Sequence, residues 1–237
     1  IIKNIKILDF CTHNLCDCIL CYYKCLNWSN KMSEDIRALN NKLKNKLPTE
    51  LIKWGIEKSA NPILTTNFGP YEISILHLCV VAKPDIKIVW CDSGYNTKAT
   101  YNYAKKIISE LKLNIKLYVP LHTAAYRSSY MPEIPNIDSP LHNQFTEEVK
   151  LEPFRRAMAE IKPDLWITNL RQGQTTFRDT INIVSETEAG LLKLSPFYNW
   201  SDKKLDRYIK ENKLENEFDY FDPTKGSEKR ECGLHGK

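Results

Sequence analysis

The sequence predicts an α/β protein with a doubly wound, mostly parallel sheet flanked by helices. Short apolar runs of strand length alternate with segments of helical length from residue 61 to about residue 212. Strands that alternate with helices in this way require crossover connections, which place the strands parallel in one sheet. At 237 residues the chain has room for one large domain with appendages.

The individual elements follow from apolar spacing and from helix start signals. Strands are expected at residues 62–66, 86–90, 114–119, 164–170 and 190–194. Helices are expected at residues 33–46, 49–59, 71–81, 97–111 and 147–161, and a last helix begins at Ser201 and Asp202. Residues 122–143 carry no strong signal. The chain therefore divides into a helical preface (32–60), a nucleotide-binding α/β domain (61–212) and a mobile carboxyl-terminal segment (213–237).

Residues 1–31 differ in character from the rest of the chain. Five of the eight cysteines lie there, at Cys11, Cys16, Cys18, Cys21 and Cys25. The first methionine is Met32, directly before a helix start signal, so one hypothesis is a leader or artefact ahead of a natural start at Met32. The alternative is a metal or cluster site that includes His13, although the cysteine spacing matches neither common zinc nor common iron–sulfur patterns.

Composition excludes some classes of function. No apolar run reaches the roughly 20 residues that span a bilayer, so no membrane partner is expected. The net charge of +5 is modest and its lysines and arginines are dispersed, which favours a small anionic ligand over nucleic acid. Only Cys79, Cys91 and Cys232 are scattered through the remaining two hundred or so residues. A domain of this size needs no disulfides, and a reducing cytoplasm is expected.

The loop after the first expected strand has the composition of an anion-binding turn. It consists of two hydroxyl side chains, an amide, an aromatic ring and a glycine, at Thr65, Thr66, Asn67, Phe68 and Gly69. Free N–H groups at the start of the next helix are expected to complete an anion cradle. The loop lacks the G-K-S/T ending of a Walker motif, and an ordinary turn is the alternative.

The loop after the second expected strand contains Asp92, Gly94 and Tyr95. An aspartate there could bind a ribose or hold a basic partner, and the tyrosine offers a face on which a base could stack. A helix-capping aspartate beside a surface tyrosine is the alternative. In doubly wound sheets ligands bind at the carboxyl ends of the strands, so this loop and the previous one are expected at one site.

The loop after the fourth expected strand brings Arg171, Gln174 and Arg178 to the same edge. Paired arginines suit bidentate capture of phosphate or sulfate. An exposed, salt-bridged loop is the alternative. Three polar loops at one edge predict a site for an anionic ligand.

Cys232 stands in a polar tail with no apolar periodicity around it. Lys229 and Arg230 precede it and His235 follows it. Nearby cations lower the pKa of a thiol and raise its thiolate fraction, which predicts a nucleophile. The alternative is a free cysteine that fills a small hole, since cysteine is among the most buried residue types.

Together these stretches resemble the sulfonucleotide reductases, specifically the 3′-phosphoadenylyl sulfate (PAPS) reductases of sulfate assimilation. The similarity runs from about residue 61 to residue 235. The matching stretches are Asn67 to Gly69 (family S-F-G), Asp92 to Tyr95 (D-T-G-Y), Leu170 to Arg178 (L-R-x-x-Q-x-x-x-R), Lys193 to Trp200 (K-V-x-P-x-x-x-W) and Glu231 to His235 (E-C-G-L-H, letter for letter).

The resemblance implies an adenine nucleotide alpha-hydrolase-like fold and an oxidoreductase. By this resemblance Cys232 attacks the sulfonate sulfur of PAPS, which yields an S-sulfocysteine and adenosine 3′,5′-bisphosphate, and thioredoxin or glutaredoxin then releases sulfite. The leaving phosphate needs no general acid, but the charge on the substrate must be neutralised. Candidates for that role are Arg171, Arg178, Lys229, Arg230 and His235. A homodimer is compatible with this assignment.

The same resemblance implies that no iron–sulfur cofactor is bound. The related adenylyl sulfate (APS) reductases hold a cluster with a Cys-Cys pair, and Phe145 and Thr146 stand near the corresponding positions here. An APS reductase without a cluster stays an alternative. Two others are an ATP pyrophosphatase-type adenylating or sulfur-transfer enzyme and a non-catalytic adenine-nucleotide-binding regulator. The former resembles S-G-G-x-D-S at the first loop, which this chain lacks.

Overall fold

The computed structural model describes residues 35–225 and Leu234. The chain forms two compact units, residues 1–42 and 43–237. Within the first unit, residues 35–42 are helical, as predicted. The cysteine-rich segment, with both hypotheses about it, lies outside the described residues.

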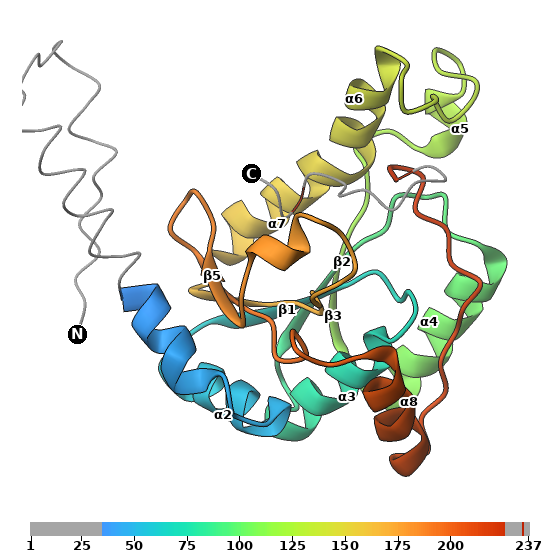
Figure 1. Cartoon of the computed structure of the whole chain (residues 1–237). Coiled ribbons are helices and arrows are strands. Elements are labelled where there is room, and N and C mark those ends of the chain that lie inside the picture. Colours follow the sequence, from blue (N-terminus) through green and yellow to red (C-terminus); the bar gives the residue numbers. More distant parts are fainter. Residues whose placement is uncertain (1–34, 226–233, 235–237) are drawn as a thin grey trace, which may run out of the picture. The chain divides into compact units, whose positions relative to one another are not determined.

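The second unit contains a six-stranded sheet with the order β3-β2-β1-β4-β6-β5. Its strands are β1 (Pro62–Thr66), β2 (Lys87–Cys91), β3 (Asn114–Tyr118), β4 (Leu165–Ile167), β5 (Val184–Glu186) and β6 (Leu192–Leu194). All neighbouring pairs are parallel except β5 and β6, which are antiparallel. The prediction of a doubly wound, mostly parallel sheet is confirmed (Figure 1).

The strand order reverses beside β1. The chain runs from β1 through β2 to β3 on one side, and then returns to place β4 on the other side of β1. In open α/β sheets the crevice outside the carboxyl ends of the strands at such a point is where ligands bind. The topology therefore directs attention to the loops that follow β1 and β4.

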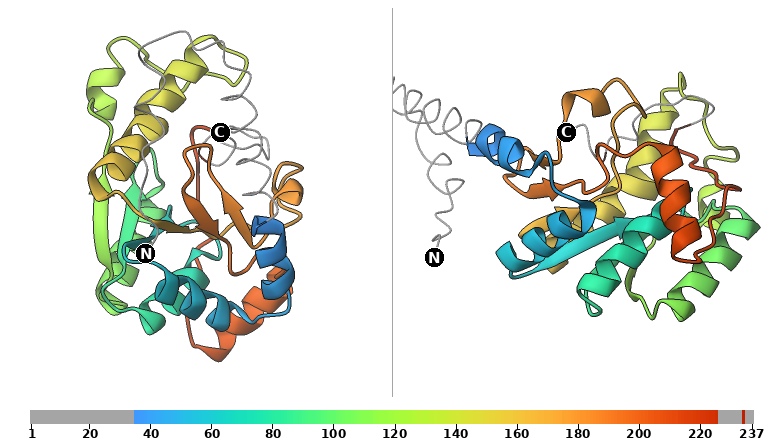
Figure 2. Two further views of the ribbon diagram at one scale, coloured as in Figure 1. Left: turned by 90° about the vertical axis from the view of Figure 1, so that its left-hand side faces the viewer. Right: turned by 60° about the horizontal axis from the view of Figure 1, so that its bottom comes forward.

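Helices flank the sheet on both faces (Figures 1 and 2). They are α2 (Pro48–Lys58), α3 (Glu72–Ala82), α4 (Lys98–Glu110), α5 (Ala124–Arg127), α6 (Leu141–Thr146), α7 (Glu152–Ile161) and α8 (Asp202–Glu211). Helix α3 contacts β1, and both α2 and α8 pack against α3, whereas α7 contacts β2 and β3. On the α7 face Ile63, Val89 and Trp166 form a buried cluster. This packing holds the strand ends that carry the site.

The predicted helix over residues 147–161 forms, but with a π-helical first turn, Glu147–Leu151, that joins α6 to α7. Pro153 lies at the start of α7. Proline has no N–H to donate and its ring clashes with the preceding turn, so a local widening of the helix accommodates it. The π turn places Lys150 in the wall of the pocket described below.

Other predicted bounds need correction. The strand expected over residues 164–170 is limited to β4, because the chain turns away after Ile167 to form the polar loop. Strand β5 was not predicted, since three residues are too few to show a period. The stretch without a signal, 122–143, contains α5 and the start of α6.

Residues 213–225 cross the carboxyl edge of the sheet and are held there by specific contacts. The hydroxyls of Thr97 and Thr100 donate to the carbonyl oxygen of Asp219 at 2.9 Å. The Tyr103 hydroxyl donates to the carbonyl oxygen of Glu215 at 2.8 Å. The segment expected to be mobile, 213–237, thus begins with a stretch tied to α4.

Candidate active site

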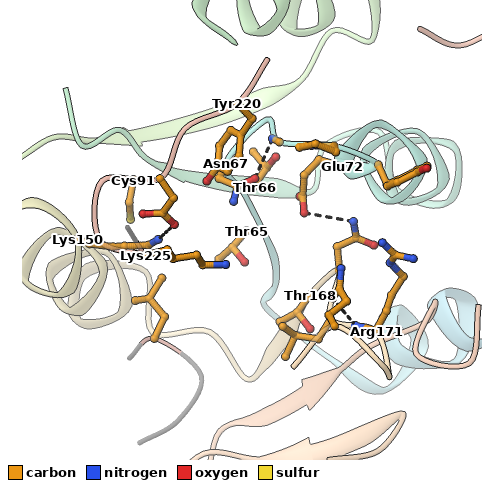
Figure 3. A pocket seen from close by; sticks show the side chains of 18 of the residues that line it. Thr65, Thr66, Asn67, Glu72, Cys91, Lys150, Thr168, Arg171, Tyr220 and Lys225 are labelled. Carbon is orange, nitrogen blue, oxygen red and sulfur yellow. Dashed lines mark hydrogen bonds and ion pairs between the residues drawn. The ribbon is translucent and has the colours of Figure 1, made fainter. Parts of the chain in front are cut away.

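A pocket of about 350 Å³ lies at the carboxyl ends of β1, β2 and β4. Its wall comes from the β1–α3 loop, the loop after β4, the π turn and the segment around residue 222 (Figure 3). Of the predicted site residues, those that line it are Thr65, Thr66, Asn67, Gly69, Arg171, Gln174 and Arg178. The structure therefore brings the first and third predicted loops together.

The β1–α3 loop is shaped by its own side chains. The Phe68 N–H donates to Thr66 Oγ1 at 3.1 Å, and the Gly69 N–H donates to Asn67 Oδ1 at 2.8 Å. The next amides are also engaged, since Tyr71 donates to the Asn216 side chain and Glu72 to the Gly69 carbonyl oxygen. The expectation of a cradle of free amides is wrong for these four groups.

Phe68 itself does not face the pocket. Its ring is fully buried and meets Trp90 edge to face at 4.9 Å. The residue adopts a positive φ of 54°, an unusual conformation for a bulky side chain. A Cβ at Gly69 would lie 2.9 Å from Asn67 Oδ1 and 3.3 Å from the Tyr220 ring, so this position favours glycine.

The two arginines of the third loop are buried at the rim of the site. Gln174 Oε1 accepts from the Arg171 N–H at 3.1 Å and from the Arg178 guanidinium, which fixes the loop between them. The Arg171 guanidinium forms an ion pair with Asp202 and lies 5.1 Å from the centre of the Tyr71 ring. Its buried Nε has no hydrogen-bond partner among the described residues. Both side chains are thus held in place by neighbouring groups rather than exposed to solvent.

The second predicted loop does not line the pocket. Asp92 Oδ1 accepts from the Gly94 N–H at 3.0 Å, the Asn96 side chain at 2.8 Å and the Tyr101 hydroxyl at 2.9 Å. Tyr95 packs edge to face against Phe145 at 5.4 Å. In this structure Asp92 stabilises its own turn, so the prediction that this loop joins the other two in the pocket is wrong.

The chain is similar in sequence to known proteins of one family. Residues 61–217 match the phosphoadenosine phosphosulfate reductase domain. A phosphoadenosine 5′-phosphosulfate reductase of Xylella fastidiosa (strain 9a5c) is 31% identical over 182 residues, 76% of this chain and 76% of that protein. One of Vibrio cholerae serotype O1 (strain O395) is 29% identical over 188 residues, 78% of this chain and 74% of that protein.

Solved structures agree on the fold. The phosphate complex of PAPS reductase from Candida auris superposes with a TM-score of 0.67 at 22% identity, covering 77% of this chain and 88% of that chain. An FMN adenylyltransferase of Candida glabrata gives a TM-score of 0.51 at 14% identity, covering 73% and 56%.

The chain belongs to the phosphoadenosine phosphosulfate reductase family. The resemblance drawn from the sequence motifs is confirmed, and so is the adenine nucleotide alpha-hydrolase-like fold. As a member of this family the chain is assigned to the oxidoreductases of sulfate assimilation.

Four residues named by the family resemblance lie outside the described residues: Lys229, Arg230, Cys232 and His235. Leu234, from the same E-C-G-L-H stretch, is described and lines the pocket. Phe145 and Thr146, which the resemblance places near the positions of the cluster-binding cysteines of APS reductases, are both buried in α6.

Several pocket residues were missed by sequence reasoning. Lys150, on the π turn, forms a buried ion pair with Asp222, whose Oδ1 also accepts from the Thr224 N–H at 3.0 Å and its hydroxyl at 2.7 Å. Lys225 and Tyr220 line the pocket from the same segment. No sequence motif marks these residues, because the partners are 72 positions apart and meet only in the fold.

Burial is the largest single influence on the pKa of three pocket groups, although other effects outweigh it in the third. It raises the pKa of Glu72 to about 7, against smaller opposing effects of Asn169, Thr66 and the two arginines. Burial also raises the pKa of the Cys91 thiol to about 12, so this thiol stays protonated at neutral pH. Asp222 is the opposite case: burial favours its neutral form, but Lys150 and Thr224 outweigh burial and lower its pKa.

In the described part of the chain no group of three or more histidine, cysteine or acidic side chains is arranged to hold a metal ion. None of the helices that the structure describes is long and apolar enough to cross a membrane.

Proposed function

We propose that the chain reduces PAPS to sulfite and adenosine 3′,5′-bisphosphate through an S-sulfocysteine at Cys232, with thioredoxin or glutaredoxin as the reductant. The observation that carries this proposal is the position of Leu234. It lies in the wall of a pocket that Arg171 and Arg178 also line. Two peptide units limit the distance between the α-carbons of Cys232 and Leu234 to about 7 Å, so the thiol is tethered close to the pocket.

The charge of the pocket suits the substrate. PAPS carries a phosphosulfate and a 3′-phosphate, and its binding requires cationic side chains away from bulk water. Arg171 and Arg178 are buried at the pocket wall, and Lys225 also lines it. We expect Lys229, Arg230 and His235 to add positive charge when the tail lies over the bound nucleotide.

The chemistry needs a thiolate and a good leaving group. The Cys232 thiolate attacks the sulfonate sulfur, a sulfur–sulfur bond forms, and the bond from that sulfur to the phosphate oxygen breaks with its electron pair on the phosphate. The phosphate leaves as an anion, so no proton donor is needed at that oxygen. A carrier thiolate then attacks the cysteine sulfur, sulfite leaves, and the second carrier thiol resolves the mixed disulfide.

We propose further that the reaction needs no iron–sulfur cluster and takes place in the cytoplasm. Phe145 and Thr146 offer no thiolate at the positions where APS reductases bind their cluster. Iron and sulfide analysis of the purified full chain tests the first statement, and stoichiometric iron would contradict it. Turnover of PAPS and of APS, measured side by side, decides the substrate.

The decisive experiment compares wild type with Cys232→Ser, and uses Cys79→Ser, on α3, as the matched control. Incubation of the wild type with PAPS in the absence of a carrier is expected to add about 80 Da, one SO₃ group, to the peptide that contains Cys232. Cys232→Ser is expected to bind the nucleotide but to release no sulfite, whereas Cys79→Ser keeps turnover because Cys79 does not line the pocket. Undiminished sulfite release by Cys232→Ser would refute the mechanism.

A further inference from the structure

One acidic side chain lies among the groups that would bind the anionic substrate. Glu72, the first residue of α3, lines the pocket together with Arg171, Arg178 and Lys225. Its position at the helix start places the carboxylate beside the loop that follows β4 (Figure 3). A carboxylate at that place repels an anion, so its presence in an anion pocket requires a physical account.

The contacts of Glu72 are polar but not ionic. Glu72 Oε1 accepts a hydrogen bond from Asn169 Nδ2 at 3.2 Å. Glu72 Oε2 is buried and has no hydrogen-bond partner among the described residues, and the two arginines act on the carboxylate through their charge. The Arg171 guanidinium is paired with Asp202. The negative charge of Asp202 therefore weakens the electrostatic effect of Arg171 on the Glu72 carboxylate.

Burial of the Glu72 carboxylate is the largest influence on its titration, and raises its pKa to about 7. Glu72 therefore populates both protonation forms at neutral pH. An anion that enters the pocket favours the uncharged form, because two like charges at short range destabilise each other.

We propose that Glu72 couples nucleotide binding to proton uptake: the anionic nucleotide binds preferentially when Glu72 is a neutral carboxylic acid, so a proton from solvent enters with the ligand. The identity of the ligand, adenosine 3′,5′-bisphosphate or its sulfated form, rests on the proposed function. The coupling itself rests on the place of Glu72 in an anion-binding pocket.

The other titratable and charged groups near Glu72 do not replace it in this role. Arg171 and Arg178 line the same pocket and contribute positive charge. Tyr103 on α4 is electrostatically coupled to Glu72, and burial raises its pKa far above neutrality. Asp202, at the start of α8, is engaged with Arg171. Glu72 is the pocket carboxyl whose pKa burial raises to about 7.

The linkage has a definite sign and size. A group whose pKa rises on binding takes up a proton, and the ligand binds more tightly as pH falls. If the ligand raises the pKa of Glu72 by about one unit, uptake reaches about half a proton near pH 7.5, and the affinity changes about tenfold between pH 9 and pH 5.

Titration calorimetry of adenosine 3′,5′-bisphosphate into the full chain measures this directly, in buffers of different ionisation enthalpy from pH 6 to pH 9. Phosphate monoesters titrate near pH 6 on their own, so the Glu72-dependent uptake is the difference between wild type and Glu72→Gln. The expected difference is about half a proton near pH 7.5. Glu57→Gln removes an exposed carboxylate from α2 and is expected to match the wild type.

A second variant keeps the test independent of the folding of Glu72→Gln. Asn169→Ala removes the hydrogen bond that lowers the pKa of Glu72. The pH at which this variant takes up the most protons on ligand binding is therefore expected to be higher than in the wild type. Equal proton uptake by wild type, Glu72→Gln and Asn169→Ala at every pH would overturn the coupling while leaving nucleotide binding intact. A wild type that binds no nucleotide would contradict the proposed function instead. In that case the three proteins are compared in the same way with inorganic phosphate as the ligand. Proton uptake that depends on Glu72 supports the coupling, and equal uptake by all three proteins overturns it.

Discussion

Removal of Lys150 is expected to destabilise the protein by leaving a carboxylate without its cation. The side chains of Lys150 and Asp222 are 13% and 5% exposed, so the pair is almost fully removed from water. Loss of one partner from such a pair costs about 3–5 kcal/mol. Because Lys150 keeps some access to the pocket, we expect the loss in Lys150→Met to lie at or just below the lower limit of that range, at about 2–3 kcal/mol.

The pH dependence of this loss has a sign that follows from the pKa of Asp222. In the folded wild type the pKa of Asp222 is lowered below its unfolded-state value of about 4. The ion pair therefore stabilises the protein at pH values above the unfolded-state pKa, and this stabilisation is lost as pH falls through the folded-state pKa. Without Lys150, burial is the largest remaining influence and raises the pKa. Protonation of Asp222 then removes the buried charge. The difference in the free energy of unfolding between wild type and Lys150→Met is therefore expected to shrink from pH 7 towards pH 4.

Urea unfolding followed by tryptophan fluorescence at several pH values measures both effects. Lys53→Met, which removes an exposed lysine from α2, is the matched control and is expected to change the free energy of unfolding by less than about 0.5 kcal/mol. Asp222→Asn combined with Lys150→Met is expected to recover part of the loss, since it removes the stranded charge. A loss below about 0.5 kcal/mol in Lys150→Met, or one that does not change with pH, would refute the reasoning.

Three further predictions test other contacts. Arg171→Gln is expected to weaken binding of adenosine 3′,5′-bisphosphate by about tenfold to a hundredfold in calorimetry, because a charged hydrogen bond contributes about 1.5–3 kcal/mol; unchanged affinity would place the anion elsewhere. Cys91, whose pKa burial raises to about 12, is expected to react with iodoacetamide at pH 8 only after unfolding in urea, as followed by peptide mass spectrometry; rapid labelling of the native protein would contradict this. Gly55→Ala places a Cβ 2.7 Å from Leu194 Cδ2. This contact is expected to lower the free energy of unfolding by about 1–3 kcal/mol in urea titration. An unfolding midpoint equal to that of the wild type would show that Leu194 moves to accommodate the added methyl group.

The local features of the fold could be predicted from the sequence. Strand β1 was predicted with its observed bounds, Pro62–Thr66, because a run of apolar and β-branched residues between turn signals is a local pattern. Helices α3 and α4 were predicted to within a residue or two for the same reason. The short elements α5 and β5 were not predicted, since they contain too few residues for a hydrophobic period to be recognised.

The candidate site was predicted in part. Arg171 and Arg178 follow a strand, and the carboxyl ends of parallel strands share one edge, so their meeting with Thr66 at one pocket could be expected. Asp92 also follows a strand but turns its carboxylate back on its own loop. Whether a polar side chain faces a ligand or its own backbone depends on loop geometry that residue identity does not specify.

By itself the sequence determined the alternation of strands and helices, the polar loops at one sheet edge and the motifs that mark the family. Each of these depends on residues close together in the chain or on a letter pattern. Only the tertiary structure decided that Lys150 meets Asp222, that residues 213–225 lie across the sheet edge, and that Glu72 lines one pocket with the two arginines. The physical reason is that pairing and burial are properties of positions in space, and chain separation alone does not encode which distant side chains share a pocket.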